Sequence, residues 1–205
     1  LAGDLNFAIG YTEPGSGTDL ASLKTKAVRD GDEYVVNGQK IYTSLAMAAD
    51  YVWLAASTDP DAPRHKGISI FLMPTDTPGF TVQPLNIMGG ADTTATFYED
   101  VRIPVANRVG EEGEGFTIAM SAIDQGRFTV ATGAVGLAQA CLDASVKYAH
   151  ERKTFGEEIG RHQLVKQMLA KMDAGIQSGR LLVWKAGWKK NRGERYTSAT
   201  ELAED

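Results

Sequence analysis

A loop near the start of the chain gathers residue types that suit contact with a small ligand. Residues 11–19 read Tyr-Thr-Glu-Pro-Gly-Ser-Gly-Thr-Asp and follow a short apolar run. Glycines let backbone N–H groups approach a ligand closely, and hydroxyl groups can donate or accept hydrogen bonds. The segment has neither the Gly-Lys-Ser/Thr ending of a Walker loop nor the spacing of a dinucleotide-binding turn. Composition alone favours an ordinary surface turn over a ligand-binding loop.

Three further groups of residues are candidates for ligand contact. Residues 37–44 (Asn-Gly-Gln-Lys-Ile-Tyr-Thr-Ser) place an aromatic ring beside hydroxyl groups, which suits one face of a flat ligand, although a plain hairpin explains the same pattern. Residues 151–156 (Glu-Arg-Lys-Thr-Phe-Gly) and 162–163 (His-Gln) combine arginine with an aromatic ring. This combination suits a phosphate-bearing cofactor or, equally, a solvated charged loop. Asp124 and Arg127 lie three positions apart on a predicted helix and can simply pair with each other.

The sequence predicts no metal site and no nucleophile. Its three histidines, His65, His150 and His162, are dispersed along the chain. Cys141 lies in an apolar helical run, which favours a position in the core. No order of Ser, His and Asp residues supports a catalytic triad.

The composition is that of a globular protein able to bury a core. The 205 residues are 43% hydrophobic and 23% charged, and a net charge of -5 argues against nucleic acid, because counterion release needs a basic face. No unbroken apolar stretch approaches the ~18 residues needed to cross a bilayer, and we see no signal peptide. We therefore expect no membrane insertion, and a cytoplasmic or mitochondrial-matrix location rather than secretion. Leu1 in place of an initiator Met indicates processing, truncation or a partial sequence.

The first half of the sequence predicts an antiparallel β-domain. Asp30-Gly31 and Asn37-Gly38 predict two tight turns, and loops rich in Pro, Asp and Gly separate the other apolar runs. Several short strands without a helical pattern between them predict a barrel or sandwich over residues 4–106. The expected strands cover residues 23–28, 34–36, 40–43, 51–56, 68–73, 80–82 and 95–103.

The second half of the sequence predicts long antiparallel helices. Apolar residues recur at helical spacing from about 115 to 150 and again from about 163 to 190, and a third helix is expected from Thr197 or Ser198. Two helices and a fraction leave an apolar face to cover, so residues 111–205 predict an incomplete four-helix bundle and a protein that is not a monomer. The fold class is therefore α+β, with two domains.

Taken together, the motifs closely resemble the acyl-CoA dehydrogenase family. Order and spacing match along nearly the whole chain, over the family's middle β-domain and the start of its C-terminal helical domain. The matching segments are residues 11–19, 37–44, 97–104, 110–116, 124–127, 133–140, 151–156 and 162–163.

The resemblance implies that FAD is held across a subunit interface. The residues that match positions lining the isoalloxazine ring are Tyr11, Thr12, Tyr42 and Ser44. The residues that match positions reaching the diphosphate and adenine side of the cofactor in the neighbouring subunit are Arg152, Phe155 and Gln163. Thr18 matches a residue that touches the pantetheine arm of the substrate, and Asp124 and Arg127 match positions near the CoA moiety. Tyr42 and Ser44 replace the more usual Trp and Thr and keep the aromatic and hydroxyl chemistry.

The same resemblance shows no catalytic base in this chain. In the family a glutamate removes the α-proton of the acyl-CoA while the β-hydrogen leaves as hydride to the flavin, and burial raises the pKa of such a carboxylate. Some members carry the glutamate immediately before the position of Arg127, where this sequence has Gly126. Most others carry it at a position beyond residue 205, and neither Glu13 nor Asp124 is a convincing substitute. We therefore expect the chain alone to be inactive or very weak.

Several alternatives stay open. The acyl-CoA dehydrogenase-like reaction implies an acyl-CoA substrate and, by resemblance, an electron-transferring flavoprotein as acceptor, in a homodimer or homotetramer. An acyl-CoA oxidase-like enzyme would pass its electrons to oxygen instead. A non-catalytic FAD- or CoA-binding subunit of a heteromeric complex is compatible with Gly126. The chain can also be a remnant of a longer enzyme.

Overall fold

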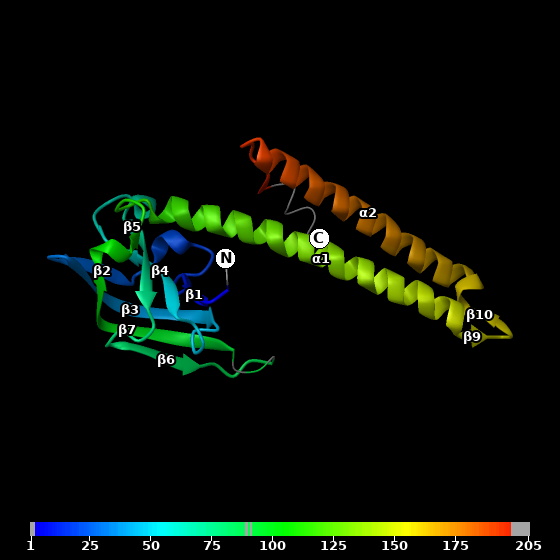
Figure 1. The fold of residues 1–205 in the computed structure, drawn as a ribbon, viewed down its shortest axis with the longest axis horizontal. Coiled ribbons are helices and arrows are strands. Elements are labelled where there is room, and N and C mark those ends of the chain that lie inside the picture. Colours follow the sequence, from blue (N-terminus) through cyan, green and yellow to red (C-terminus); the bar gives the residue numbers. More distant parts are fainter. Residues whose placement is uncertain (1–2, 89, 91, 198–205) are drawn as a thin grey trace. The chain divides into compact units, whose positions relative to one another are not determined.

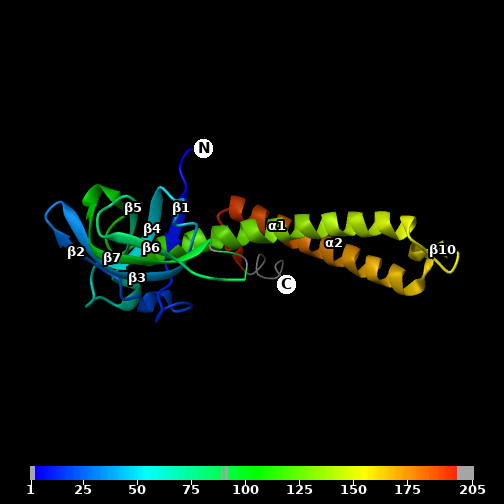
Figure 2. The ribbon, with the colours of Figure 1, turned by 90° about the horizontal axis from the view of Figure 1, so that it is seen from below.

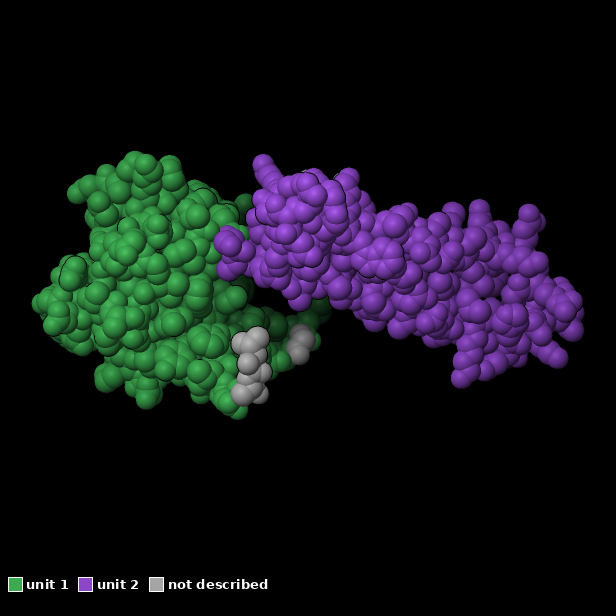
Figure 3. All heavy atoms as spheres, turned by 45° about the horizontal axis from the view of Figure 1, so that its top comes forward, with its two compact units in different colours: residues 1–120 green, residues 121–205 purple. Residues whose placement is uncertain are grey.

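The computed structural model describes residues 3–88, 90 and 92–197 and divides the chain into two compact units. The first comprises residues 1–120 and the second residues 121–205; Figure 3 gives each its own colour. The sequence predicts domains at 4–106 and 111–205. The first unit extends further than its predicted range, because a short strand and the first turns of a long helix belong to it.

The first unit is built on one eight-stranded sheet of order β6-β7-β3-β2-β4-β5-β8, with β1 paired to β4 off this path (Figure 1). The pairs are antiparallel, except that β1 runs parallel to β4 and β2 meets β4 in parallel at one register position. The α+β class is confirmed. Over the described strands, however, the sheet is open and mixed, not a closed antiparallel barrel. The strands are β1 (Phe7–Gly10), β2 (Lys26–Asp30), β3 (Glu33–Ser44), β4 (Tyr51–Ser57), β5 (Ile68–Pro74), β6 (Phe80–Pro84), β7 (Thr93–Pro104) and β8 (Arg108–Val109).

Both faces of this sheet are packed. Ile70 and Phe71 are neighbours in β5 and point to opposite faces, and both are fully buried. Phe71 joins a cluster with Tyr34 and Tyr98, whereas Ile70 joins a cluster that includes Ala119. The second cluster therefore buries the first turns of the helix that follows the sheet.

The sequence pattern predicts a turn at Asn37-Gly38, and that prediction is wrong. Strand β3 continues through both residues, and its register against β7 shifts between Val36 and Gly38. The Asn37 amide closes this bulge: its Nδ2 donates to Asp100 Oδ1 at 2.9 Å, and its Oδ1 accepts from the Asp100 backbone N–H at 2.9 Å. A Cβ on Gly38 would lie 2.7 Å from Thr25 Cα, so close strand approach explains the glycine.

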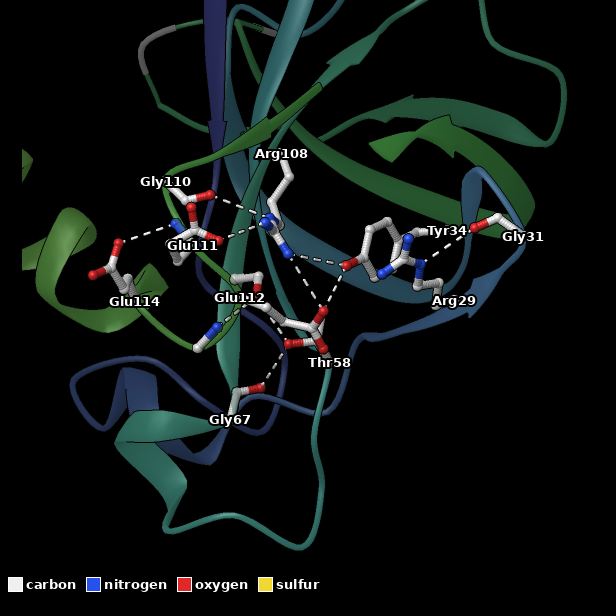
Figure 4. A network of polar contacts seen from close by, with 12 residues as sticks. Arg29, Gly31, Tyr34, Thr58, Gly67, Arg108, Gly110, Glu111, Glu112 and Glu114 are labelled. Carbon is white, nitrogen blue, oxygen red and sulfur yellow. Dashed lines mark hydrogen bonds and ion pairs between the residues drawn. The ribbon is translucent and has the colours of Figure 1, made fainter. Parts of the chain in front are cut away.

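A polar network fixes the segment between the sheet and the first long helix, α1 (Gly115–Glu151) (Figure 4). The buried Tyr34 hydroxyl donates to Glu112 at 2.7 Å, and Arg108 forms ion pairs with Glu111 at 3.1 Å and Glu112 at 3.4 Å. Because Tyr34 lies on β3 and Arg108 on β8, the network connects distant strands to the start of α1.

The second unit contains most of α1 and the helix α2 (Gln163–Asn191), which lie side by side in Figures 1 and 2. They are joined by the small hairpin β9 (Lys153–Thr154) and β10 (Glu157–Glu158). The predicted helices agree with these bounds to within a residue. A side-chain contact between the helices is the 2.6 Å hydrogen bond from Arg180 to Gln139. The predicted third helix begins at Thr197 or Ser198, and all of it after Thr197 lies outside the described residues.

Many large apolar side chains of the two helices are exposed within this unit. Cys141 is exposed as well, so its predicted core position is wrong: two helices cover only part of each other's surface. An 18-residue window of α1 reaches a mean hydropathy of 1.2, enough by length and composition alone to cross a membrane. A core helix of a larger bundle passes the same test. The exposed large apolar residues are Val130, Leu137, Val146, Tyr148, Leu164, Met168, Leu181, Trp184 and Trp188.

Candidate functional site

The first unit contains an open cavity of about 330 Å³ beside the ends of β1 and β3. All four residues predicted to line an isoalloxazine ring contribute to it, although they come from two segments of the sequence. Its full lining is Phe7, Ile9, Tyr11, Thr12, Ile41, Tyr42, Ser44 and Leu45. The structure therefore brings together the candidates of the first unit, with the exception of Thr18, which is exposed and does not line the cavity.

The backbone at the end of β3 is twisted so that it presents side chains to this cavity. Tyr42 has φ 59 and Leu45 has φ 62, a left-handed conformation that costs a non-glycine residue about 1–2 kcal/mol. The register against β7 shifts again between Ile41 and Thr43. As a result Tyr42 is 63% exposed and Leu45 58% exposed, although the intervening Thr43 is buried. Strain of this kind is typical of binding sites.

The loop at residues 11–19 forms the second wall, and it is connected to β3. The Ile41 backbone N–H donates to the Thr12 carbonyl at 2.8 Å. The Tyr11 hydroxyl accepts a 2.8 Å hydrogen bond from Trp53 Nε1, and burial raises the pKa of Tyr11. Glu13 and Ser16 close the loop on itself through two backbone hydrogen bonds of 2.8 and 3.1 Å.

Behind this wall lies a buried ion pair between Glu13 and Lys40. Lys40 Nζ lies 2.9 Å from Glu13 Oε1, with the two side chains 0% and 6% exposed. Burial by itself raises the pKa of Glu13, but the charge and hydrogen bonds of Lys40 and the Thr25 N–H outweigh it and hold that pKa below its usual range. Burial lowers the pKa of Lys40 to about 8. An ionised carboxylate of low pKa with these donors is unsuited to act as a general base.

In the second unit, three candidates lie together at one end of the helix pair. Arg152 precedes β9, Phe155 is at the tip of the β9–β10 hairpin, and Gln163 is the first residue of α2. Phe155 has φ 53 and is 99% exposed, and Gly156 has φ 84, which is the two-residue turn of a tight hairpin. All three candidates are exposed and available to a ligand or a neighbouring chain.

The remaining candidates lie on α1. Asp124 is partly buried and accepts a hydrogen bond of 3.4 Å from the Thr197 hydroxyl, and Arg127 is exposed. Gly126 is exposed, and a Cβ there would meet nothing within 4 Å. The helix therefore has room for a side chain at this position, and only the residue type excludes a carboxylate.

Sequence reasoning missed half of the cavity. Phe7 and Ile9 are 47% and 57% exposed and alternate along β1 with buried residues. This alternation is visible in the sequence, but the strand is too short to predict which face is covered. Ile41 lies within the candidate segment 37–44 but has no role assigned from the sequence, and the exposure of Leu45 depends on the irregular backbone at the end of β3.

Comparison with known proteins shows family matches in both halves of the chain. Residues 8–101 match the family model described as the middle domain of acyl-CoA dehydrogenase, and residues 113–203 match the model of its C-terminal domain. The acyl-CoA dehydrogenase FadE26 of Mycobacterium tuberculosis is 46% identical over 187 residues, which are 89% of this chain and 46% of that protein.

Two solved structures are similar in both sequence and fold. Butyryl-CoA dehydrogenase from Megasphaera elsdenii has a TM-score of 0.88 at 37% identity, covering 96% of this chain and 52% of that one. The ChsE4-ChsE5 complex from Mycobacterium tuberculosis has a TM-score of 0.86 at 42% identity, covering 98% and 52%. The chain spans about half the length of these relatives. With two domain models matched in order and relatives this similar, the chain belongs to the acyl-CoA dehydrogenase family.

Proposed function

We propose that the cavity of the first unit holds the isoalloxazine ring of FAD. The observation that carries the proposal is that Tyr11, Thr12, Tyr42 and Ser44 line one cavity. A volume of about 330 Å³ is at the lower end of the range of small-molecule sites. The apolar lining suits the faces of the ring, and the hydroxyl groups of Thr12 and Ser44 suit its nitrogen and oxygen atoms.

In this proposal the protein to which the cavity belongs performs α,β-dehydrogenation of an acyl-CoA thioester. Bound FAD supplies the two-electron acceptor for that chemistry. The chain's own residues bind and orient: Tyr42 and Leu45 cover one part of the cavity, and Ser44 offers a hydroxyl group beside them. We place Thr18, Asp124 and Arg127 near the CoA portion of the substrate, as the family resemblance implies.

We further propose, as the family resemblance implies, that the described residues do not include the proton-abstracting carboxylate. Glu13 is engaged by Lys40 and by backbone N–H groups, and Gly126 has no side chain. The chain by itself should therefore bind flavin but oxidise acyl-CoA at most very weakly. Dye-coupled oxidation of acyl-CoA by a preparation whose intact mass matches the 205 residues would contradict this part of the proposal.

The exposed end of the helix pair supports a role in assembly. We propose that Arg152, Phe155 and Gln163 contact the diphosphate and adenine side of FAD bound in a neighbouring subunit. Arginine suits a diphosphate, and an exposed aromatic ring suits stacking on an adenine.

The electron acceptor that we propose for the enzyme is an electron-transferring flavoprotein. Release of hydrogen peroxide on addition of acyl-CoA would favour oxygen as the acceptor instead.

FAD titration of the chain tests the ring site. We expect Tyr42→Ala and Ser44→Ala to weaken binding by roughly tenfold, about 1.4 kcal/mol, as measured by quenching of flavin fluorescence. Thr81→Ala, on the exposed side of β6, is the control and should leave the affinity unchanged. Equal affinity in all four proteins, or no binding at all, would refute the assignment.

A second candidate function is a subunit of a heteromeric dehydrogenase that shares its site with a homologous chain. Gly126 favours this reading, because a glycine supplies no carboxylate at the position before Arg127. A solved relative of 42% identity also comes from the ChsE4-ChsE5 complex. Co-purification of a second homologous chain from the native source would support it. A single chain type in an active preparation would exclude it.

A further inference from the structure

We propose that Lys40 and Glu13 are positioning residues for the flavin ring: their buried ion pair holds the loop at 11–19 against β3, so that the two walls of the cavity keep their spacing. The inference rests on the proposed function, because it assumes that the cavity holds the ring. It assigns a role to two charged residues that do not line the cavity.

The first argument is that Lys40 connects the two walls from behind the cavity. It lies on β3 two residues before Tyr42, and its Nζ donates to Glu13 Oε1 at 2.9 Å and to the Tyr11 carbonyl oxygen at 3.1 Å. A single ammonium group thus connects the strand that carries Tyr42 and Ser44 with the loop that carries Tyr11.

The second argument is that Glu13 extends the connection beyond the 11–19 loop, to the start of the chain that leads into β2. Its Oε2 accepts from the Lys24 backbone N–H at 2.7 Å, and its Oε1 accepts from the Thr25 backbone N–H at 2.8 Å. The carboxylate therefore brings the two ends of the 13–25 segment together at Lys40. The Ile41 to Thr12 hydrogen bond of 2.8 Å continues the same contact next to the cavity.

The third argument concerns energy. Removing two charges from water costs much of what their attraction returns, so a fully buried ion pair stabilises a fold little compared with an apolar pair of the same volume. Its geometric demands are nevertheless strict, because both ions must keep all their partners. A pair of this kind, buried beside a ligand cavity, is suited to fixing one arrangement of two segments.

The test separates position from stability by comparing Lys40→Met with the double variant Glu13→Met/Lys40→Met. The single variant leaves a buried carboxylate without its cation and should be the less stable of the two, whereas the double variant replaces the pair with apolar side chains. Tyr34→Phe, which loses a buried hydrogen bond at the other end of β3, is the matched control for a comparable loss of stability.

Two measurements are made on the whole chain. Hydrogen exchange in the protein without flavin should become faster at the amides of Ser16, Thr25 and Ile41 in both Lys40 variants and remain unchanged there in Tyr34→Phe. Riboflavin, which has the ring but no diphosphate, is then titrated at a temperature where all four proteins are folded. We expect binding to both Lys40 variants to weaken by on the order of tenfold, and binding to Tyr34→Phe to stay at the wild-type value.

The outcomes distinguish this inference from the proposed function. If wild-type protein binds riboflavin and the folded double variant binds it equally tightly with unchanged exchange, the positioning role is wrong and the ring site stands. If the wild-type chain binds neither riboflavin nor FAD, both proposals fail, because there is no ring to position.

Discussion

The indole Nε1 of Trp53 lies 2.8 Å from the hydroxyl oxygen of Tyr11 and donates a hydrogen bond to it. Trp53 is on β4, directly across from Ile9 of the cavity wall, so the sheet itself orients the tyrosine. Indole has one N–H and no acceptor, which leaves the Tyr11 hydroxyl proton free to serve another acceptor.

Trp53→Phe should therefore lower both stability and flavin affinity. The loss of one partly buried hydrogen bond costs about 0.5–1.5 kcal/mol, and the smaller ring adds a packing loss of similar size. Chemical unfolding and FAD titration measure the two effects. Trp188→Phe, an exposed tryptophan of the second unit, is the control and should change neither quantity. Unchanged flavin affinity in Trp53→Phe would show that the Trp53–Tyr11 hydrogen bond has no part in binding.

Stability should fall in acid partly through Glu13. Its pKa in the folded protein lies below the usual value of 4.5, because the effect of Lys40 and the backbone donors exceeds that of burial. Between these two pKa values the unfolded chain binds more protons, so the stabilisation present above pH 4.5 is lost as the pH falls through the folded pKa.

Urea unfolding of wild type and Glu13→Gln over this pH range measures the difference. The variant should be the less stable protein near neutrality, and its free energy of unfolding should depend less steeply on pH in acid. Parallel curves for the two proteins would mean that Glu13 titrates alike in the folded and unfolded states.

Gly126→Glu should stabilise the helical unit. Glycine inside a helix is less favourable than a residue with a good helix propensity by about 0.5–1 kcal/mol, and an added Cβ meets nothing within 4 Å. Thermal unfolding followed by circular dichroism should show a higher midpoint, and Gly133→Ala, in similarly open space on α1, should behave alike. A lower midpoint in Gly126→Glu alone would reveal a local electrostatic cost at this position.

The sequence predicted regular elements better than irregular ones. The turn at Gly31 has φ 62, as its Asp-Gly pattern predicts, and both long helices were located from their apolar spacing. Asn37-Gly38 carries the same local turn pattern, but its pairing with β7 keeps it inside a strand. Local propensity could not reveal this, because the deciding partner, Asp100, is far away in the sequence.

The candidate site was predicted through family resemblance more than through physical pattern. Tyr11 and Tyr42 are separated by a long segment, and neither composition nor periodicity indicates that they line one cavity. Lys40 falls in an expected strand, but nothing local in the sequence predicts its complete burial, which its ion pair with Glu13 explains. The positive φ of Tyr42 and Leu45 depends on tertiary packing and has no sequence pattern of its own.

The most direct test of the ring site is a crystal structure of the protein in complex with FAD. The account predicts electron density for the isoalloxazine ring in the cavity, in contact with Tyr11, Thr12, Tyr42 and Ser44, with the Ser44 hydroxyl within hydrogen-bonding distance of the ring. A ring bound elsewhere on the protein, with the cavity filled only by water, would contradict it.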